Sequence, residues 1–198
     1  MSDVAIIDSG GANIASLVFA LQRLGCRASL TREADAIRRA ARVILPGVGA
    51  AADAMARLEA AGLAPLNPAL EQPVLGICLG MQLLFEASEE GPSGCLGILA
   101  GTAQRFHAAP GRSVPHMGWN QLQALQPSPL LRDVASGEYA YFVHSYRLPV
   151  GPATVATSDY GGPFSAVVSH GNFHGTQFHP ERSGRVGAAV LRNFLEIG

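Results

Sequence analysis

Apolar and polar positions in the first half of the chain follow two alternating patterns. Short continuous apolar runs bounded by glycine or proline predict buried strands, at residues 4–8, 43–45 and 74–78. Apolar residues three and four positions apart predict helices, at residues 14–24 (capped by Asn13 and ended by Gly25), 50–61 and 79–87. Strands that alternate with helices predict a mostly parallel central sheet with helices on both faces.

The second half of the chain has a different pattern, in which short strand-like runs follow one another with few helices between them. We expect strands at residues 139–146, 153–157, 166–169 and 173–178. The last two are joined by 170–172, which suit a tight hairpin, and a final helix is predicted at 184–195. We therefore expect one α/β domain over residues 1–198, with an antiparallel extension in its C-terminal half.

Composition supports a compact domain and excludes several partners. The 198 residues fit one domain of ordinary size. Charged residues make up 15% of the chain and hydrophobic residues 48%, which excludes a disordered protein and leaves apolar surface for a partner. The formal net charge of −1 gives no basic face, so we expect no nucleic acid partner.

All 14 cationic residues are arginine, and this excludes two kinds of chemistry. A chain without lysine has no Schiff-base amine and no P-loop lysine to reach nucleotide phosphates. Its three cysteines are Cys26, Cys78 and Cys95, an odd number without C-x-x-C spacing. We therefore expect neither a disulfide framework nor a zinc site.

The apolar segments are too short for a membrane protein. The most apolar stretch, residues 73–85, is far shorter than the ~20 residues that a membrane-spanning helix needs. The first residues lack a basic leader followed by a cleavage site. We expect no membrane association and a cytoplasmic location.

The strongest chemical signal is G-I-C-L-G at residues 76–80, between a predicted strand and a predicted helix. In such a nucleophile elbow the turn is so sharp that only glycine fits beside the nucleophile. The helix N-terminus favours the thiolate of Cys78, and the backbone N–H of Leu79 can stabilise an oxyanion. The alternative is a buried structural cysteine, but the two glycines favour the nucleophile.

A nucleophilic cysteine needs a base and a group that orients the base, and Q-F-H-P-E at 177–181 offers both. Residues two apart in an extended segment share one side, so His179 and Glu181 can lie together. A surface turn is the alternative. A second oxyanion donor is predicted in the loop Gly47, Val48 and Gly49, for which a simple turn is the alternative.

The other histidines and cysteines give weaker signals. His107, His170 and His174 are expected at the surface. His144, beside aromatic residues, is expected to be half-buried with its hydrogen bonds satisfied rather than catalytic. Cys26 and Cys95 are expected to be structural.

Together, P-G-V-G (46–49), G-I-C-L-G-M-Q-L-L (76–84) and Q-F-H-P-E (177–181) resemble the class I, triad-type glutamine amidotransferases. P-H-M-G-W-N (115–120) and Y-F-V-H-S-Y (141–146) resemble one branch of that family, the glutaminase subunits of imidazole glycerol phosphate synthase. The resemblance runs along nearly the whole chain. It departs from the family at Ala12, where the opening loop commonly has a second glycine.

The resemblance implies roles for individual residues. Cys78 would be the nucleophile, His179 the general base and acid, and Glu181 the group that orients His179. The substrate glutamine would contact Gly49, Gln82, Glu90, Ser145 and Tyr146. The oxyanion strand would be Gly47, Val48 and Gly49. The face toward the synthase subunit would include Asn13, His116, Met117, Gly118, Trp119 and Asn120.

The implied reaction is hydrolysis of L-glutamine without a cofactor. The ammonia would pass along a covered route to a (β/α)₈-barrel cyclase subunit in a heterodimer. In the family that partner makes imidazole glycerol phosphate and aminoimidazole carboxamide ribonucleotide for histidine biosynthesis. Three alternatives stay open: the glutaminase of another synthase, a cysteine peptidase or hydrolase, and a regulatory subunit with an inactive site.

Overall fold

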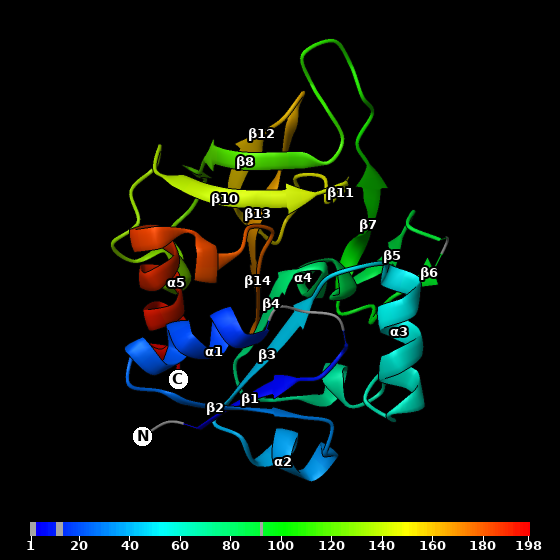
Figure 1. The fold of residues 1–198 in the computed structure, drawn as a ribbon, viewed down its shortest axis with the longest axis vertical. Coiled ribbons are helices and arrows are strands. Elements are labelled where there is room, and N and C mark those ends of the chain that lie inside the picture. Colours follow the sequence, from blue (N-terminus) through cyan, green and yellow to red (C-terminus); the bar gives the residue numbers. More distant parts are fainter. Residues whose placement is uncertain (1–2, 11–13, 92) are drawn as a thin grey trace.

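The computed structural model describes residues 3–10, 14–91 and 93–198, and its centre is an eight-stranded sheet (Figure 1). Five strands form the parallel part, in the order β2 (Arg27–Thr31), β1 (Asp3–Ile7), β3 (Arg42–Gly47), β4 (Val74–Cys78) and β14 (Phe173–Thr176). Three further strands extend the sheet antiparallel beyond β14, namely β13 (Pro163–His170), β12 (Thr154–Asp159) and β9 (Gln123–Ala124). The predicted mostly parallel sheet with an antiparallel extension is confirmed.

Helices cover both faces of the parallel strands because successive strand residues point to opposite sides. In β1, Val4 and Ile6 pack in the cluster that includes α1 (Ile14–Arg23) and α5 (Gly184–Glu196). Ala5 and Ile7 pack in the opposite cluster with α2 (Ala34–Arg39) and α3 (Ala51–Ala60). The alternation places two apolar cores on the two faces of one sheet.

The C-terminal strands return the chain to the middle of the sheet. β13 and β14 pair antiparallel with His170 opposite Phe173, so a two-residue turn at Gly171 and Asn172 joins them, as the sequence predicts. Gly171 has φ +57°, which a tight hairpin turn of this kind requires. β14 then lies parallel to β4, and this places the segment after β14 beside the end of β4.

A second layer of short strands stands above the carboxyl ends of the parallel strands (Figure 1). β8 (His116–Gln121) pairs with β10 (Tyr139–His144). A four-stranded sheet joins β11 (Tyr146–Arg147), β7 (Leu99–Arg105), β5 (Phe85–Ser88) and β6 (Ser93–Gly94). Single 3₁₀ turns are η1 (Asn67–Ala69), η2 (Pro129–Leu131) and η3 (Pro180–Arg182).

The predicted helix at residues 79–87 is wrong in length. α4 covers only Leu79–Leu83, and the chain then enters β5, which pairs with β7. Pairing with a strand distant in sequence overrides the local helical pattern here. The predicted strand at 139–146 is also interrupted, because β10 ends at His144 and β11 begins at Tyr146.

In the part of the chain that the structure describes, no helix is both long enough and apolar enough to cross a membrane.

Candidate active site

The turn between β4 and α4 holds Cys78 in a strained conformation, with φ 54° and ψ −111°. Close backbone packing explains the two glycines that flank it. A Cβ on Gly80 would lie 1.8 Å from the carbonyl oxygen of Leu45, and one on Gly76 would lie 2.7 Å from the carbonyl oxygen of Gly80. The predicted nucleophile elbow is therefore present, with glycine required on both sides.

The sulfur of Cys78 has a hydrogen-bonding partner for each of its protonation states. Its Sγ lies 3.8 Å from the carbonyl oxygen of Val143, to which a thiol can donate. The Nε2 of Gln177 donates to the same sulfur at 3.7 Å. The side chain is almost buried, with 7% of Cys78 exposed.

His179 lies beside the sulfur and is held from behind by Glu181. The Nδ1 of His179 is 2.9 Å from the Oε1 of Glu181, and since the carboxylate only accepts, Nδ1 carries the proton. Burial acts to lower the pKa of His179, but Cys78 and Glu181 outweigh it and raise this pKa to about 10. An imidazolium between a sulfur and a carboxylate can act as a general acid.

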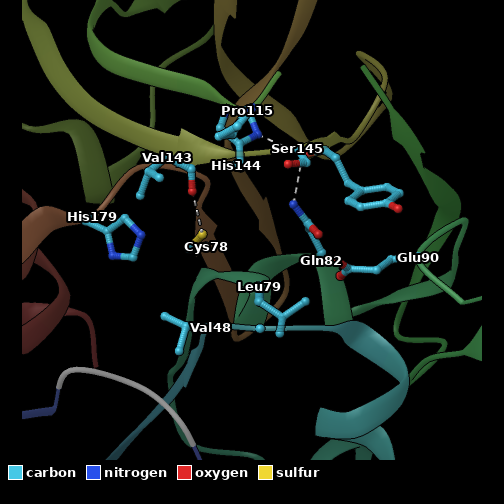
Figure 2. Close-up of a pocket in the computed structure, with 12 residues that line it drawn as sticks. Val48, Cys78, Leu79, Gln82, Glu90, Pro115, Val143, His144, Ser145 and His179 are labelled. Carbon is cyan, nitrogen blue, oxygen red and sulfur yellow. Dashed lines mark hydrogen bonds between the residues drawn. The ribbon is translucent and has the colours of Figure 1, made fainter. Parts of the chain in front are cut away.

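A cavity of about 330 Å³ opens over Cys78 (Figure 2). Its lining includes the two reactive side chains, Cys78 and His179, and all five residues that the resemblance assigns to the substrate: Gly49, Gln82, Glu90, Ser145 and Tyr146. Glu181 is not part of this lining. The structure thus brings residues from segments far apart in the sequence around one cavity of the size that small ligands occupy.

The candidate oxyanion donors meet at the same place. Gly47 is paired with Cys78 across β3 and β4, and Val48, Gly49 and Leu79 line the cavity. Leu79 is the first residue of α4, so its N–H has no acceptor within the helix and is available to an oxyanion. Gly49 has φ +89°, a conformation that favours glycine.

Glu90 stands at the far end of the cavity in Figure 2. Its Oε2 accepts a hydrogen bond of 3.0 Å from the N–H of Ala51. Burial, with a smaller contribution from Asp53, raises the pKa of Glu90 although the bond from Ala51 lowers it. A carboxylate here can receive a cationic group of a ligand.

Gln177 is a site residue that the sequence reasoning missed. It is fully buried, donates to Cys78 and accepts a hydrogen bond of 2.9 Å from the Nε2 of Gln82. It belongs to the same Q-F-H-P-E motif and lies two residues before His179, so its place in the motif pointed to the site. The motif is not one extended segment, however, because residues 177 and 178 form a bend and Glu181 lies in η3.

Two buried histidines, His144 and His116, are hydrogen-bonded to each other on the other side of the cavity. The Nδ1 of His144 lies 2.7 Å from the carbonyl oxygen of Tyr146 and therefore donates, so its Nε2 accepts from the Nδ1 of His116 at 2.9 Å. Burial lowers the pKa of His116 to about 4 and that of His144 to about 3. Both rings are neutral near pH 7.

Two histidines, His144 and His174, are more buried than we expect from the sequence. His144 is 6% exposed and fully satisfied rather than half-buried. His174, expected at the surface, is 4% exposed and its Nδ1 bonds to Ser169, because β14 lies between β4 and β13 within the sheet. Burial also lowers the pKa of His174. His107 and His170 are exposed as expected.

The residues of strand β8 that we expect at a partner face point to opposite sides of the strand. Met117 and Trp119 expose 66% and 56% of their surface, with Gly118 between them. His116 points the other way and is buried, so its side chain is not presented to a partner. Asn120 also turns inward, where its Nδ2 donates to the carbonyl oxygen of Asp159. Asn13, and Ala12 with it, lie outside the described residues.

The other two cysteines, Cys26 and Cys95, are not among the described residues that line the cavity. Cys26 is buried and Cys95 half-buried, and neither forms a disulfide. Within residues 3–10, 14–91 and 93–198, no group of three or more His, Cys, Asp or Glu side chains is placed to hold a metal ion.

The family model "Glutamine amidotransferase class-I" matches residues 5–197 of the chain. The chain belongs to the class I glutamine amidotransferase family. Among its amidotransferase relatives is the imidazole glycerol phosphate synthase subunit HisH of Xylella fastidiosa strain Temecula1. The two are 56% identical over 197 residues, which cover 100% of this chain and 98% of the relative. The subunit of the same name from Xanthomonas axonopodis pv. citri is 55% identical with the same coverage.

Solved structures share the fold of this amidotransferase at low sequence identity. A crystal structure described as glutamine amidotransferase has a TM-score of 0.74 and 21% identity, over 98% of this chain and 97% of that chain. A glutamine amidotransferase from Thermotoga maritima has a TM-score of 0.72 and 16% identity, over 98% of this chain and 96% of that chain.

Proposed function

We propose that this amidotransferase is the glutaminase subunit of an imidazole glycerol phosphate synthase and acts in histidine biosynthesis. The observation that carries the activity is the convergence of Cys78, His179 and the elbow N–H of Leu79 on one cavity, with Glu181 behind His179. The assignment to this branch of the family rests on 56% identity to a HisH subunit over the full length of this chain.

The site supports acyl transfer through a thioester. The thiolate of Cys78 attacks the carboxamide carbon of glutamine, and backbone N–H groups of the elbow and of the 47–49 loop stabilise the tetrahedral oxyanion. Protonated His179 gives its Nε2 proton to the departing nitrogen, which leaves as ammonia. Neutral His179 then takes a proton from water, which attacks the glutamyl thioester and releases glutamate. Glu181 keeps the ring oriented throughout.

The polar residues that line the cavity suit a glutamine ligand. Glu90 can receive the α-ammonium group, and the backbone of Ser145 and Tyr146 can bind the α-carboxylate end. Gln82 lies between them and the nucleophile.

The ammonia would go to a (β/α)₈-barrel cyclase partner in a heterodimer in the cytoplasm. Ammonia protonates readily in bulk water, so the transfer needs a covered route. The exposed pair Met117 and Trp119 on β8 is the apolar surface we assign to this partner.

Glutamate release from glutamine tests the function in three mixtures: this chain alone, with the cyclase, and with the cyclase and its nucleotide substrate. Strong stimulation in the third mixture supports the proposal. Equal turnover in all three mixtures would support the glutaminase activity but would indicate that the chain serves another synthase. Preferential hydrolysis of peptides would instead indicate a peptidase.

A further inference from the structure

The amide groups of Gln82 and Gln177 form a directional hydrogen-bonded chain that ends at the nucleophile. The chain begins at the carbonyl oxygen of Tyr146, which accepts from the Nε2 of Gln82 at 2.9 Å. The same Nε2 donates to the Oε1 of Gln177 at 2.9 Å. The Nε2 of Gln177 then donates to the Sγ of Cys78. Figure 2 shows the first link, with the nitrogen of Gln82 directed toward the 145–146 segment.

The main chain fixes the orientation of both amides. A carbonyl oxygen only accepts, so the nitrogen of Gln82 must face Tyr146. Both N–H groups of Gln82 are then used, one on Tyr146 and one on Gln177. Turning the amide of Gln177 around would place two nitrogen donors 2.9 Å apart and an oxygen against the sulfur. Gln177 therefore presents a donor to Cys78, and Gln82 keeps its oxygen for a ligand in the cavity.

We propose that Gln177 is a positioning residue that holds the amide of Gln82 in one orientation and stabilises the thiolate of Cys78 through an N–H donor. This inference rests on the proposed glutaminase function. The sulfur lies between the carbonyl oxygen of Val143, which favours a thiol, and the N–H of Gln177, which favours a thiolate. Loss of the Gln177 donor shifts this balance toward the unreactive thiol.

Two variants separate the two roles. Gln177→Glu keeps an oxygen acceptor for Gln82 but turns an oxygen toward the sulfur, so kcat should fall on the order of ten- to a hundredfold while KM changes little. Gln177→Met removes both bonds at similar side-chain length, so kcat should fall and KM should rise. Thr176→Val is the matched control, because Thr176 is equally buried and its hydroxyl bonds only to the carbonyl oxygen of Phe178.

The decisive readout is the pH profile of Cys78 alkylation by iodoacetamide, measured on the full chain without glutamine or partner. Alkylation is followed on the Cys78 peptide by mass spectrometry, because Cys95 is also accessible. The titratable groups already around the sulfur are unchanged in these variants: His179 with Glu181, and His144 and Glu90 across the cavity. Gln177→Glu adds a carboxyl group beside the sulfur that itself disfavours the thiolate, so Gln177→Met is the variant that isolates the loss of the donor. We expect both Gln177 variants to alkylate on the order of tenfold more slowly at pH 7 and to regain rate at higher pH.

Each outcome decides the inference. A profile shifted in the Gln177 variants and unchanged in Thr176→Val supports it. An unshifted profile in Gln177→Met overturns it, even if Gln177→Glu shifts, because the added carboxyl can shift the profile by its charge alone. An equal shift in Thr176→Val also overturns it, because that result would indicate a general packing effect. If Gln177→Glu does not fold, as judged by thermal unfolding, Gln177→Met alone supplies the readout. Glutamate release by the wild-type chain with its partner reports separately on the proposed function.

Discussion

Two walls enclose the catalytic cavity, and different forces hold them in place. The elbow wall, formed by the end of β3, Cys78 and the start of α4, is set by backbone contacts so close that a Cβ at Gly80 would overlap the carbonyl of Leu45. The histidine wall, formed by β8, β10 and residues 145–146, is set by hydrogen bonds of two neutral buried histidines. Steric contacts are indifferent to pH, whereas a buried neutral histidine resists protonation.

Because of this difference, the two walls contribute to the site in different ways. The elbow wall fixes the nucleophile whatever the protonation state of its surroundings. The histidine wall positions the carbonyl of Tyr146, and through it Gln82, by the bond from the Nδ1 of His144. Protonation of His144 would place a donor on its Nε2 against the Nδ1–H of His116 and break the bond between the two rings. We therefore expect changes in the elbow wall to act on chemistry or folding and changes in pH to act first on the histidine wall.

Cys78→Ala should give the largest effect on chemistry. We expect glutamine hydrolysis to fall by at least about a thousandfold, because no other group can form the thioester. The free energy of unfolding near pH 7 should change little by comparison, since the backbone of the elbow is kept. Synthesis from added ammonia by the complex should persist, and its loss would mean that the subunit does more than supply ammonia.

Gly80→Ala should act on folding. The added Cβ meets backbone that cannot move aside, so we expect a loss of roughly 3–5 kcal/mol in the free energy of unfolding, measured by urea titration. Gly94→Ala is the control, because a Cβ there has no atom within 4 Å. It should change stability by less than about 0.5 kcal/mol. Similar values for the two variants would remove the steric account of the elbow.

Glu181→Gln should reduce kcat/KM by about ten- to a hundredfold, because the ring loses a charged orienting partner but not its chemistry. Without the carboxylate the pKa of His179 should fall from its raised value, so the alkaline limb of the pH–rate profile should move to lower pH. A variant profile that coincides with the wild-type profile would contradict the orienting role.

Stability should depend on pH with opposite signs for two sets of buried histidines. His116, His144 and His174 have lowered pKa values, so below pH about 6.5 the unfolded chain binds protons that the folded chain refuses. By pH 5 we expect a loss on the order of 2 kcal/mol or more in the free energy of unfolding. The raised pKa of His179 gives stability that is present below pH about 6.5 and lost as pH rises toward 10.

Urea unfolding between pH 5 and pH 9 measures both limbs, with a maximum expected near pH 6.5. Cys78→Ala separates them, because it removes a group that raises the pKa of His179. The alkaline limb should flatten in this variant while the acid limb stays. An acid limb that flattens with it would show that His179 and the histidines with lowered pKa values do not titrate independently.

Trp119→Ala with Met117→Ala should have the smallest effect on the chain itself, within about 0.5 kcal/mol, because both side chains are exposed. Binding to the cyclase should weaken on the order of tenfold or more, measured by isothermal titration calorimetry. Leu30→Ala, an exposed apolar residue on the edge strand β2, should leave binding unchanged. Unchanged binding in the double variant would remove this face from the interface.

The elbow wall could be predicted from sequence because its signals are local. Glycines at 76 and 80, an apolar strand before them and the H-P-E segment all lie within a few residues of the groups they position. The predicted oxyanion segments and the substrate residues followed from the same motifs or from the resemblance. The mostly parallel sheet followed from the alternation of strand and helix patterns. The paired strands β13 and β14 were also readable from their turn.

In the histidine wall, the strand at 139–144 and residues 145–146 were predicted, but β8 and the bond between the two histidines were not, because pairing between separate segments creates them. β8 contains Gly118 and Asn120, which do not favour strands, and forms only through its register with β10. The same cause ends α4 early in favour of β5. The inward direction of His116 depends on that register, so no local pattern shows it.

Covalent labelling by an electrophilic glutamine analogue, read by mass spectrometry of the intact chain and its peptides, tests whether the cavity over Cys78 binds and processes glutamine. We predict stoichiometric modification of Cys78, with Cys26 and Cys95 unmodified, and protection by excess glutamine. No labelling of Cys78, or labelling that glutamine does not slow, would contradict a glutaminase built on this cavity.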